Sequence, residues 1–361
     1  MKKAFLTAGL ILSAAILYLL LWPVPIDPVA WQAPADRGLV DPFGPDDRLA
    51  SARGLHLGEH DGPEDVTGGH DGRIYVTTKD GFILQVDGYG NVQEFAEVGG
   101  RALGIETDQD GTLVSANAYV GLQRISASGS VETILSEIDG RPLVYADDLA
   151  IGNDGTIYFS EASTKFGAKA SAGTYEGSLL DIMEHGGHGQ IIEFNPGTGV
   201  TSVILDGLNF ANGVAISEDQ RYLLIAETGS YRILRFWLEG AARGSVEVVL
   251  DNLPGFPDNI NNGLNDRFWI GLVSPRNGLL DMLSDKPFVR KIVQRLPAFV
   301  RPKVTRSAHV IAINGDGEVL MNLQDPAAKF SSLTGVYETR DSLYLTALFG
   351  DYLPVLKKED L

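Results

Sequence analysis

The sequence of 361 residues contains no cysteine, which excludes disulfide bonds, thiol chemistry and cysteine-based metal sites. Basic residues are also few: 29 Lys and Arg stand against 47 Asp and Glu, and the formal net charge is −18. Nucleic acids bind to basic surfaces, so this imbalance argues against a nucleic-acid partner. A solvated acidic surface is the simplest explanation of the charge, and the excess of acids also favours cation binding.

The first 22 residues differ from the rest of the chain. An apolar run covers residues 4–22, which is about long enough for a helix to cross a hydrocarbon core of roughly 30 Å. It lacks an Ala-x-Ala exit, so we predict an uncleaved anchor; a cleaved signal peptide and a buried globular helix are the alternatives. Lys2 and Lys3 should stay cytoplasmic. This predicts a single-pass membrane protein whose bulk faces the periplasm, a lumen or the exterior.

Residues 23–50 are rich in Pro, Asp and Ala and are predicted to form a tether. Residues 51–361 repeat one unit, in which an Asp/Asn/Gly turn precedes a strand rich in Ile, Tyr, Val and Leu. Six such cores begin at Gly68, Thr107, Ile151, Ile216, Asn261 and Glu338, and an outer strand pair begins at Ile313. Their spacing of roughly 40–60 residues is typical of propeller blades, whereas an immunoglobulin-like array would repeat at longer intervals. We predict an all-β, six-bladed β-propeller behind an N-terminal transmembrane helix.

Two stretches interrupt the pattern. Residues 276–306 are predicted to be a short helical insert, with an apolar stripe of Phe288, Val289, Ile292, Val293 and Leu296. Residues 286–306 carry seven basic side chains and no acid, so the insert is a second candidate for membrane contact, with its basic residues outward. It could also cover the tunnel as a lid, or pack on the propeller. Residues 165–189, which contain His185 and His188, are predicted to form a mobile loop.

Acids and amides recur at one position of the predicted blades, just ahead of a small apolar strand. They are Glu64 in GPEDV, Asp147 in YADDLA, Asn212 in FANGVA, and Asp258 and Asn259 in FPDNI. Equivalent positions of different blades converge on the propeller axis, so these side chains should share one small volume. Crowded carboxylates repel one another, and a hard cation such as Ca²⁺, which takes six to eight oxygen ligands, relieves the repulsion. We therefore predict an axial calcium site.

Asp148 follows Asp147 and should point to the opposite face of the strand. Two roles stay open for it: a ligand of a second, structural cation, or a cap for buried backbone groups. No Cys or His falls at the axial positions, which disfavours zinc and copper.

At these residues the sequence resembles the strictosidine synthase-like group, within the wider superfamily of gluconolactonases, senescence marker protein, paraoxonases and squid-type diisopropylfluorophosphatase. The matching motifs are GPEDV, GRALGI, YADDLAI, IYFSEAS, FANGVAIS, LLIAETGSYRILRFWLEG and LPGFPDNI. The resemblance implies a six-bladed propeller with an axial calcium in hydrolase members. It implies the ligands Glu64, Asp147, Asn212, Asp258 and Asn259. It also places Asp148 where paraoxonases have an aspartate on a second calcium.

Three features depart from the pattern of these families. Asp147 stands where Asn is usual, Leu103 stands where paraoxonases have their catalytic His, and no acid lies near Ser331–Thr334, where strictosidine synthases have their catalytic Glu. Alkaloid condensation is therefore not expected. The expected activity is calcium-dependent hydrolysis of a small-molecule lactone, aryl ester or phosphotriester, with Asp147 or Asp258 as nucleophile or general base. The alternative is a membrane-tethered binding or scaffold protein without turnover.

Overall fold

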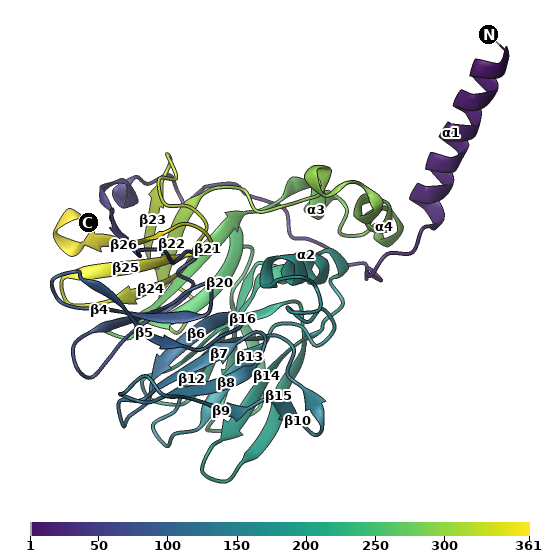
Figure 1. Ribbon diagram of the computed structural model, residues 1–361. Helices are drawn as coiled ribbons and strands as arrows, with labels where there is room; N and C mark the ends of the chain where they lie inside the picture. The colour runs from purple at the N-terminus through teal and green to yellow at the C-terminus, as the bar shows by residue number, and fades with distance from the viewer. Residues whose placement is uncertain (1) are drawn as a thin grey trace.

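The computed structural model describes residues 2–361, and over this range six antiparallel sheets of four strands each form the body of the molecule (Figure 1). Blade 1 contains β2 (Val66–Gly68), β3 (Ile74–Thr77), β4 (Phe82–Val86) and β5 (Val92–Glu97). Blade 2 contains β6 (Ala102–Thr107), β7 (Leu113–Asn117), β8 (Gly121–Ile125) and β9 (Val131–Leu135). Blade 3 contains β12 (Ala146–Ile151), β13 (Ile157–Glu161), β14 (Gly189–Asn195) and β15 (Val200–Leu208).

The second half of the chain supplies the other three blades. Blade 4 contains β16 (Ala211–Ile216), β17 (Tyr222–Glu227), β18 (Arg232–Trp237) and β19 (Val246–Leu250). Blade 5 contains β20 (Gly255–Asn262), β21 (Phe268–Pro275), β22 (Ala308–Ile313) and β23 (Val319–Asp325). Blade 6 contains β24 (Leu333–Glu338), β25 (Ser342–Ala347), β26 (Tyr352–Lys357) and, as its outer strand, β1 (Arg53–His56). A small hairpin, β10 (Glu137–Ile138) and β11 (Arg141–Pro142), follows blade 2.

The prediction of a six-bladed propeller is confirmed, and each of the six predicted cores coincides with the first hairpin of a blade, from β2–β3 to β24–β25. The pair predicted from Ile313 is β22–β23. Strand β1 pairs with β26 in the register Arg53↔Val355, so the two ends of the propeller share one sheet. This pairing closes the ring and leaves no long free edge between the first and last blades.

The core lies between neighbouring blades. One apolar cluster joins Val114 of blade 2 to Leu149 and Phe159 of blade 3, and another joins Leu224 of blade 4 to Ile270 of blade 5. These side chains are almost fully buried. Because each sheet buries both faces in this way, a polar residue on an inner strand is buried and needs a hydrogen-bond partner or a ligand.

Helices gather at one end of the propeller, on the side from which the N-terminal helix projects (Figure 1). They are α1 (Lys2–Leu21), α2 (Thr174–Glu184), α3 (Gly278–Met282), α4 (Pro287–Arg295) and the 3₁₀ turn η3 (Ala298–Val300). Further 3₁₀ turns are η1 (Arg48–Ser51), η2 (Thr228–Ser230) and η4 (Lys358–Asp360). We call α2, α3, α4, η3 and residues 301–304 the cap. In the described part of the chain, no helix combines the length and hydropathy that a membrane span requires, so the transmembrane helix stays a prediction.

The cap corrects one sequence prediction and confirms another. The insert 276–306 is helical, as predicted, in α3 and α4. The loop predicted over residues 165–189 is wrong for residues 174–184, which form α2. Its glycines and serines concealed an apolar helical face that includes Leu179 and Ile182, which lies against the propeller axis.

The predicted outward orientation of the basic insert is wrong for two of its arginines. Arg290 and Arg295 are buried, at 1% and 8% exposure. Arg295 donates to the carbonyl of Trp22 at 2.6 Å and to that of Leu19 at 3.0 Å, at the end of α1. Arg290 donates to backbone carbonyls of α2 and of the tether. The two guanidinium groups thus fasten the N-terminal segment to the cap, because the backbone ends there leave carbonyls in need of donors.

Candidate active site at the propeller axis

A β-bulge interrupts the innermost strand pair of five blades at the same place. In blade 3, Ala146 pairs with Glu161 and Leu149 pairs with Phe159, so Asp147 and Asp148 together oppose one residue. Equivalent shifts occur in blades 2, 4, 5 and 6. Bulges of this kind change the direction of side chains and are frequent beside active sites.

We call the two bulged residues of each blade its doublet. Glu64–Asp65 takes this position in blade 1, where both residues bond to the backbone of Thr77. The six doublets are Glu64–Asp65, Leu103–Gly104, Asp147–Asp148, Asn212–Gly213, Asp258–Asn259 and Thr334–Gly335. All of them lie at the inner ends of the blades, so the bulges bring together residues that are up to 270 positions apart in the sequence.

The first residues of five of the six doublets line one cavity, which we call the axial cavity. Its volume is about 90 Å³, and its walls include Glu64, Leu103, Asp147, Asn212 and Asp258. The structure therefore brings four of the predicted site residues to one place. Asn259, the fifth predicted ligand, is fully buried beside them, and its Nδ2 donates to Glu64 Oε1 at 3.2 Å and to the Glu64 carbonyl at 3.0 Å.

Hydrogen bonds at the axis leave several acceptor atoms free. Asn212 Nδ2 donates to Asp258 Oδ1. Among the described residues, Glu64 Oε2, Asn212 Oδ1 and Asn259 Oδ1 are buried without a hydrogen-bond partner. Each buried acceptor without a donor costs about 1–3 kcal/mol. Three such oxygens from blades 1, 4 and 5, with carboxylates close by, are a donor set that fits a hard cation.

The described residues do not contain a cluster of ionisable side chains that could hold a metal ion by itself. Within residues 2–361, no group of three or more His, Cys, Asp or Glu side chains is placed to hold a metal ion. The oxygens without partners belong to one carboxylate and two amides. The fit to a cation therefore rests on the mixed acid and amide set rather than on clustered carboxylates.

Burial and mutual repulsion raise the pKa values of the axial acids. The pKa of Glu64 is raised well above its ordinary value by burial and then by the charges of Asp258 and Asp147. The pKa of Asp147 is likewise raised, first by burial and then by Asp258. Burial also raises the pKa of Asp258 to about 7, although the bond from Asn212 opposes the shift. Each acid would therefore ionise more readily beside a positive charge.

The second residues of the doublets hold the blades together. Asp65 accepts the backbone N–H of Ile105 at 2.9 Å, and Asp148 accepts that of Val214 at 2.8 Å. Asp148 also accepts the N–H of Leu149, so both of its oxygens bond to backbone donors. Asp148 thus faces away from the axial cavity, as predicted, and performs the backbone-capping role of the two that the sequence left open.

Glycine takes the second position in blades 2, 4 and 6, because the neighbouring blade occupies the space. A Cβ on Gly104 would lie 2.6 Å from Asp148 Oδ1, and one on Gly213 would lie 2.4 Å from the backbone nitrogen of Ile260. A Cβ on Gly335 would lie 2.6 Å from Asn261 Oδ1. Side chains in blades 1, 3 and 5 therefore depend on the glycines of the blades between them.

Sequence reasoning missed three residues at the axis. Asn261 accepts the Val336 N–H at 2.9 Å and donates to Asp65 at 2.8 Å, and both it and Asp65 are buried. Arg101 is a buried cation whose charge favours ionised Glu64 and Asp147. The sequence did contain a signal for these residues. Asp65 directly follows the predicted ligand Glu64, Asn261 lies two positions after the predicted ligand Asn259, and Arg101 directly precedes the innermost strand of blade 2.

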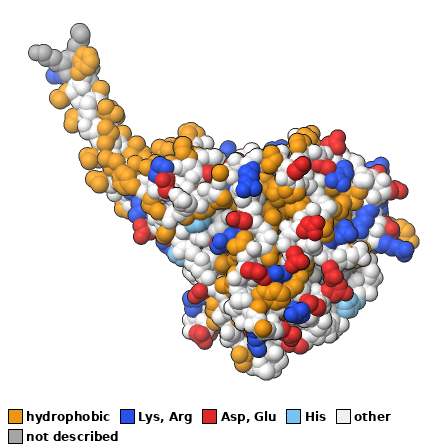
Figure 2. Space-filling view, turned by 180° about the vertical axis from the view of Figure 1, so that it is seen from behind, with side chains coloured by type: hydrophobic (Ala, Val, Ile, Leu, Met, Phe, Trp, Pro, Cys, Tyr) orange, Lys and Arg blue, Asp and Glu red, His pale blue; other side chains and the backbone are white. Residues whose placement is uncertain are grey.

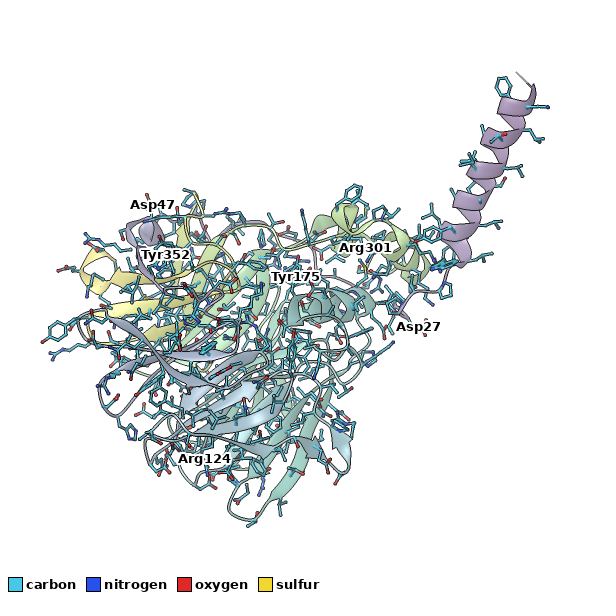
Figure 3. All side chains as sticks on the ribbon, in the orientation of Figure 1. Asp27, Asp47, Arg124, Tyr175, Arg301 and Tyr352 are labelled. Atoms are coloured by element: carbon cyan, nitrogen blue, oxygen red, sulfur yellow. The ribbon has the colours of Figure 1, made fainter. Side chains whose placement is uncertain are left out.

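The cap forms the roof of the axial cavity. Tyr175 and Leu179 of α2, Leu280 of α3 and the segment 302–304 contribute to its lining (Figure 3, where Tyr175 and Arg301 are labelled). Tyr145 Oη donates to the Thr174 carbonyl at 2.7 Å and so ties blade 3 to the first turn of α2. One alternative for the insert 276–306 was a lid over the tunnel. Leu280 and residues 302–304 of the insert take that position, because they line the axial cavity.

His185 and His188 lie away from the axis, at the end of α2. His188 Nε2 bonds to Glu184 Oε1 at 2.6 Å, and His185 stacks on Trp31 with 3.9 Å between ring centroids. His309 is buried on β22 and bonds to Asn322. Neither the pair nor His309 lines the axial cavity.

Comparisons with known proteins agree with this architecture. Residues 147–241 match the family model described as strictosidine synthase, and residues 41–86 match the one described as strictosidine synthase-like, N-terminal. Adipocyte plasma membrane-associated protein of Bos taurus is 30% identical over 98% of this chain and 88% of its own length. Strictosidine synthase-like protein 6 of Arabidopsis thaliana is 31% identical over 84% of this chain and 81% of its own.

Solved structures show the same fold at low identity. A gluconolactonase from Xanthomonas campestris matches with a TM-score of 0.63 and 17% identity, covering 86% of this chain and 90% of its own. Regucalcin of Agrobacterium tumefaciens, a calcium-binding protein, matches with a TM-score of 0.59 and 14% identity, covering 85% of this chain and 93% of its own. At these identities the likeness shows the propeller fold alone.

Proposed function

The chain belongs to the strictosidine synthase-like family, and from that premise we propose that it is a membrane-anchored, calcium-dependent hydrolase of a lactone, aryl ester or phosphotriester. One observation carries the proposal: buried acceptor oxygens without donors from three blades lie beside Asp147 and Asp258. The gluconolactonase and the calcium-binding regucalcin add support, because they have the same propeller.

The residues that would hold calcium are Glu64, Asn212 and Asn259 through their free oxygens, with Asp147 and Asp258 beside them. Bound there, calcium would polarise the carbonyl or phosphoryl oxygen of the substrate as a Lewis acid. Asp148 caps backbone N–H groups with both of its oxygens. A second role for it, as ligand of a second cation, is not tested by these contacts and stays a prediction.

The carboxylates at the axis are the proposed bases of this site. The described residues that line the axial cavity include no histidine, and Leu103 takes the position of the paraoxonase His. Asp258 is fixed by the amide of Asn212, whereas Asp147 has no amide partner in the described chain. We assign to Asp147 the role of nucleophile or general base, and Asp258, held by the amide of Asn212, is the alternative for the same role.

The N-terminal helix supplies the membrane anchor in this proposal. Its apolar residues are exposed, including Leu10, Ile11 and Leu17, and nothing in the described chain covers them beyond the contacts near Tyr18 and Trp22. The printed name of the bovine relative, plasma membrane-associated, supports the same role. Lys2 and Lys3 place the N-terminus in the cytoplasm and the propeller on the opposite side. Protease digestion of sealed vesicles tests this topology: cleavage of the propeller only from the cytoplasmic side contradicts it.

Calcium binding and turnover are tested separately. Calcium should raise the melting temperature of the chelator-treated wild type, because a ligand that binds only the native state stabilises it by about 2.7 kcal/mol at 100 times its Kd. Glu64→Gln should abolish that rise, and Glu239→Gln, on an exposed loop, should preserve it. A rise that persists in Glu64→Gln contradicts the proposed ligand set.

Turnover is measured on a panel of lactones, aryl esters and phosphotriesters. Asp147→Asn should keep the calcium-dependent rise in melting temperature and lower kcat by about 10²-fold or more, as expected for loss of a general base. If calcium binds but no substrate of the panel is hydrolysed by the wild type, the non-catalytic binding protein becomes the better account.

A further inference from the structure

A second cavity adjoins the axial one, between the end of α1 and the cap. We call it the outer cavity; its volume is about 590 Å³, against about 90 Å³ for the axial cavity. Tyr175, Leu179, Pro302 and Lys303 line both cavities, so a wall one side chain thick separates them. Sites for drug-sized ligands have volumes of roughly 300–1,000 Å³. The axial cavity alone holds only a small polar group, whereas the outer cavity has room for a larger one.

From this geometry we propose that the substrate is an amphiphile that enters from the lipid surface. Its ester or lactone group reaches the axial acids, and its hydrocarbon chain lies in the outer cavity beneath α4. The inference rests on the proposed hydrolase function and names the substrate class of that same site.

The walls of the outer cavity suit a hydrocarbon chain. Leu179, Leu180 and Met183 of α2 contribute one side, and Trp22 and Val24 contribute the other. Burying each CH₂ of a chain against such a lining favours binding by roughly fourfold. Other members of the lining are polar or charged, among them Glu176, Gln294, Arg295, Arg301 and Lys303.

The opening of this cavity is continuous with the apolar helix. Tyr18 and Trp22, which line the cavity, belong to or directly follow α1. Arg295 fixes this junction by donating to the carbonyls of Leu19 and Trp22. Nearby, Phe299 is 79% exposed and Trp22 is 60% exposed. Figure 2 shows hydrophobic side chains along α1 and on the adjoining surface of the body. A helix that lies in lipid would thus place the opening at the lipid surface, which favours a lipid-dissolved substrate over a water-soluble one.

The wall between the cavities is lightly fastened. Tyr175 Oη accepts the backbone N–H of Val304 at 3.2 Å, and its ring meets Phe349 edge-on at 5.8 Å between centroids. Rotation of the Tyr175 side chain would therefore break one hydrogen bond and thin the wall between the two cavities. In this arrangement Tyr175 is a gate for the substrate chain rather than a catalytic residue.

The test fills the outer cavity without touching the axis. Ala298 lines the outer cavity only and is exposed, so Ala298→Trp should fold normally while occupying the space for a chain. Ala241→Trp, on an exposed turn of blade 4, is the matched control. The full chain is used in lipid nanodiscs with calcium. The probe is a twelve-carbon methyl ketone with a terminal diazirine, which cannot be hydrolysed, and a four-carbon analogue accompanies it.

The twelve-carbon probe should crosslink to peptides from residues 175–183 and 294–303, at least tenfold less in Ala298→Trp and unchanged in Ala241→Trp. On aryl esters, kcat/KM should rise at least tenfold from four to twelve carbons, and Ala298→Trp should remove that rise while leaving the four-carbon ester unchanged. Crosslinks elsewhere, or equal in Ala298→Trp and wild type, would overturn the inference. If no ester is hydrolysed the proposed function fails, and the crosslinking result still decides where the chain binds.

Discussion

Replacing Arg290 by methionine should release the tether from the cap while the six blades stay folded. The buried guanidinium of Arg290 donates to the carbonyls of Met183 at 2.9 Å, Glu184 at 3.2 Å and Ser284 at 3.1 Å, and to that of Val29. One side chain therefore connects α2, the α3–α4 turn and the tether. Methionine fills a similar volume and provides no donor.

The magnitude follows from the acceptors that lose their donor. Hydrogen bonds to charged groups contribute about 1.5–3 kcal/mol each, but desolvating Arg290 offsets part of that sum, and its Nε is buried without a partner. The carbonyls of Glu184 and Ser284 keep the N–H groups of Val29 and Trp31 as donors, whereas each buried carbonyl left without a donor costs about 1–3 kcal/mol. We expect the local opening free energy of the tether to fall by about 3 kcal/mol, which corresponds to roughly a hundredfold loss of hydrogen-exchange protection.

Hydrogen exchange measured by mass spectrometry tests whether Arg290→Met lowers the protection of the tether. The informative amides are those of Val29, bonded to the Glu184 carbonyl at 2.9 Å, and Trp31, bonded to the Ser284 carbonyl at 3.0 Å. Amides of the inner strands, such as that of Val214, should keep their protection. The matched control is Lys291→Met, because the ammonium group of Lys291 pairs, in the described part of the chain, with the exposed carboxylate of Asp27 at 2.6 Å, and such pairs contribute little. Equal protection of the Val29 and Trp31 amides in both variants would refute the proposed role of Arg290 in holding the tether on the cap.

Two further predictions test the axis and the acid stability. Gly213→Ala should destabilise the fold by about 3 kcal/mol or more in urea titrations, because its Cβ would lie 2.4 Å from a backbone nitrogen of the next blade, whereas Gly278→Ala, in open space, should change little; similar effects at both positions would contradict the packing argument. Burial lowers the pKa of His309 to about 4, below the unfolded value of about 6.5. The unfolded chain thus binds the extra proton between these values, and stability falls as the pH drops from 6.5 to 4. His309→Gln keeps a donor to Asn322 and should reduce the loss of unfolding free energy between pH 6.5 and 4 by about 2–3 kcal/mol. An unchanged dependence of the unfolding free energy on pH in this variant would contradict the assignment to His309.

The blades were predictable because their signals are local. Each core has an Asp or Asn turn followed by alternating apolar residues, and these fix a hairpin without help from the rest of the chain. The outer pair β22–β23 has the same signal in Asn314-Gly315-Asp316-Gly317. Residues at the same position of different blades meet at the propeller axis. This explains why one cavity is lined by Glu64, Asp147, Asn212 and Asp258.

The cap was less predictable because its interactions are distant in sequence. Burial of Arg290 depends on the Val29 carbonyl, 261 residues away, and burial of Arg295 depends on Trp22, 273 residues away. Taken alone, a basic helix with an apolar stripe indicates an exposed amphipathic surface. Similarly, the glycines around α2 indicate a loop. A helix is favoured there because its apolar face, which includes Leu179, packs over the axial cavity.

The doublets also explain how so many acids coexist at one axis. Successive residues of a strand point to opposite sides, so each doublet separates two tasks. In blades 1 and 3 the second acid, Asp65 or Asp148, accepts backbone N–H groups of the neighbouring blade and serves the structure. The first acid, Glu64 or Asp147, faces the cavity and is left for a ligand. Exchanging the two tasks would require a one-residue slip of the inner strand, which would also remove Asp65 or Asp148 from the backbone N–H group of the neighbouring blade. The chemistry of the axis is therefore tied to the packing of the ring.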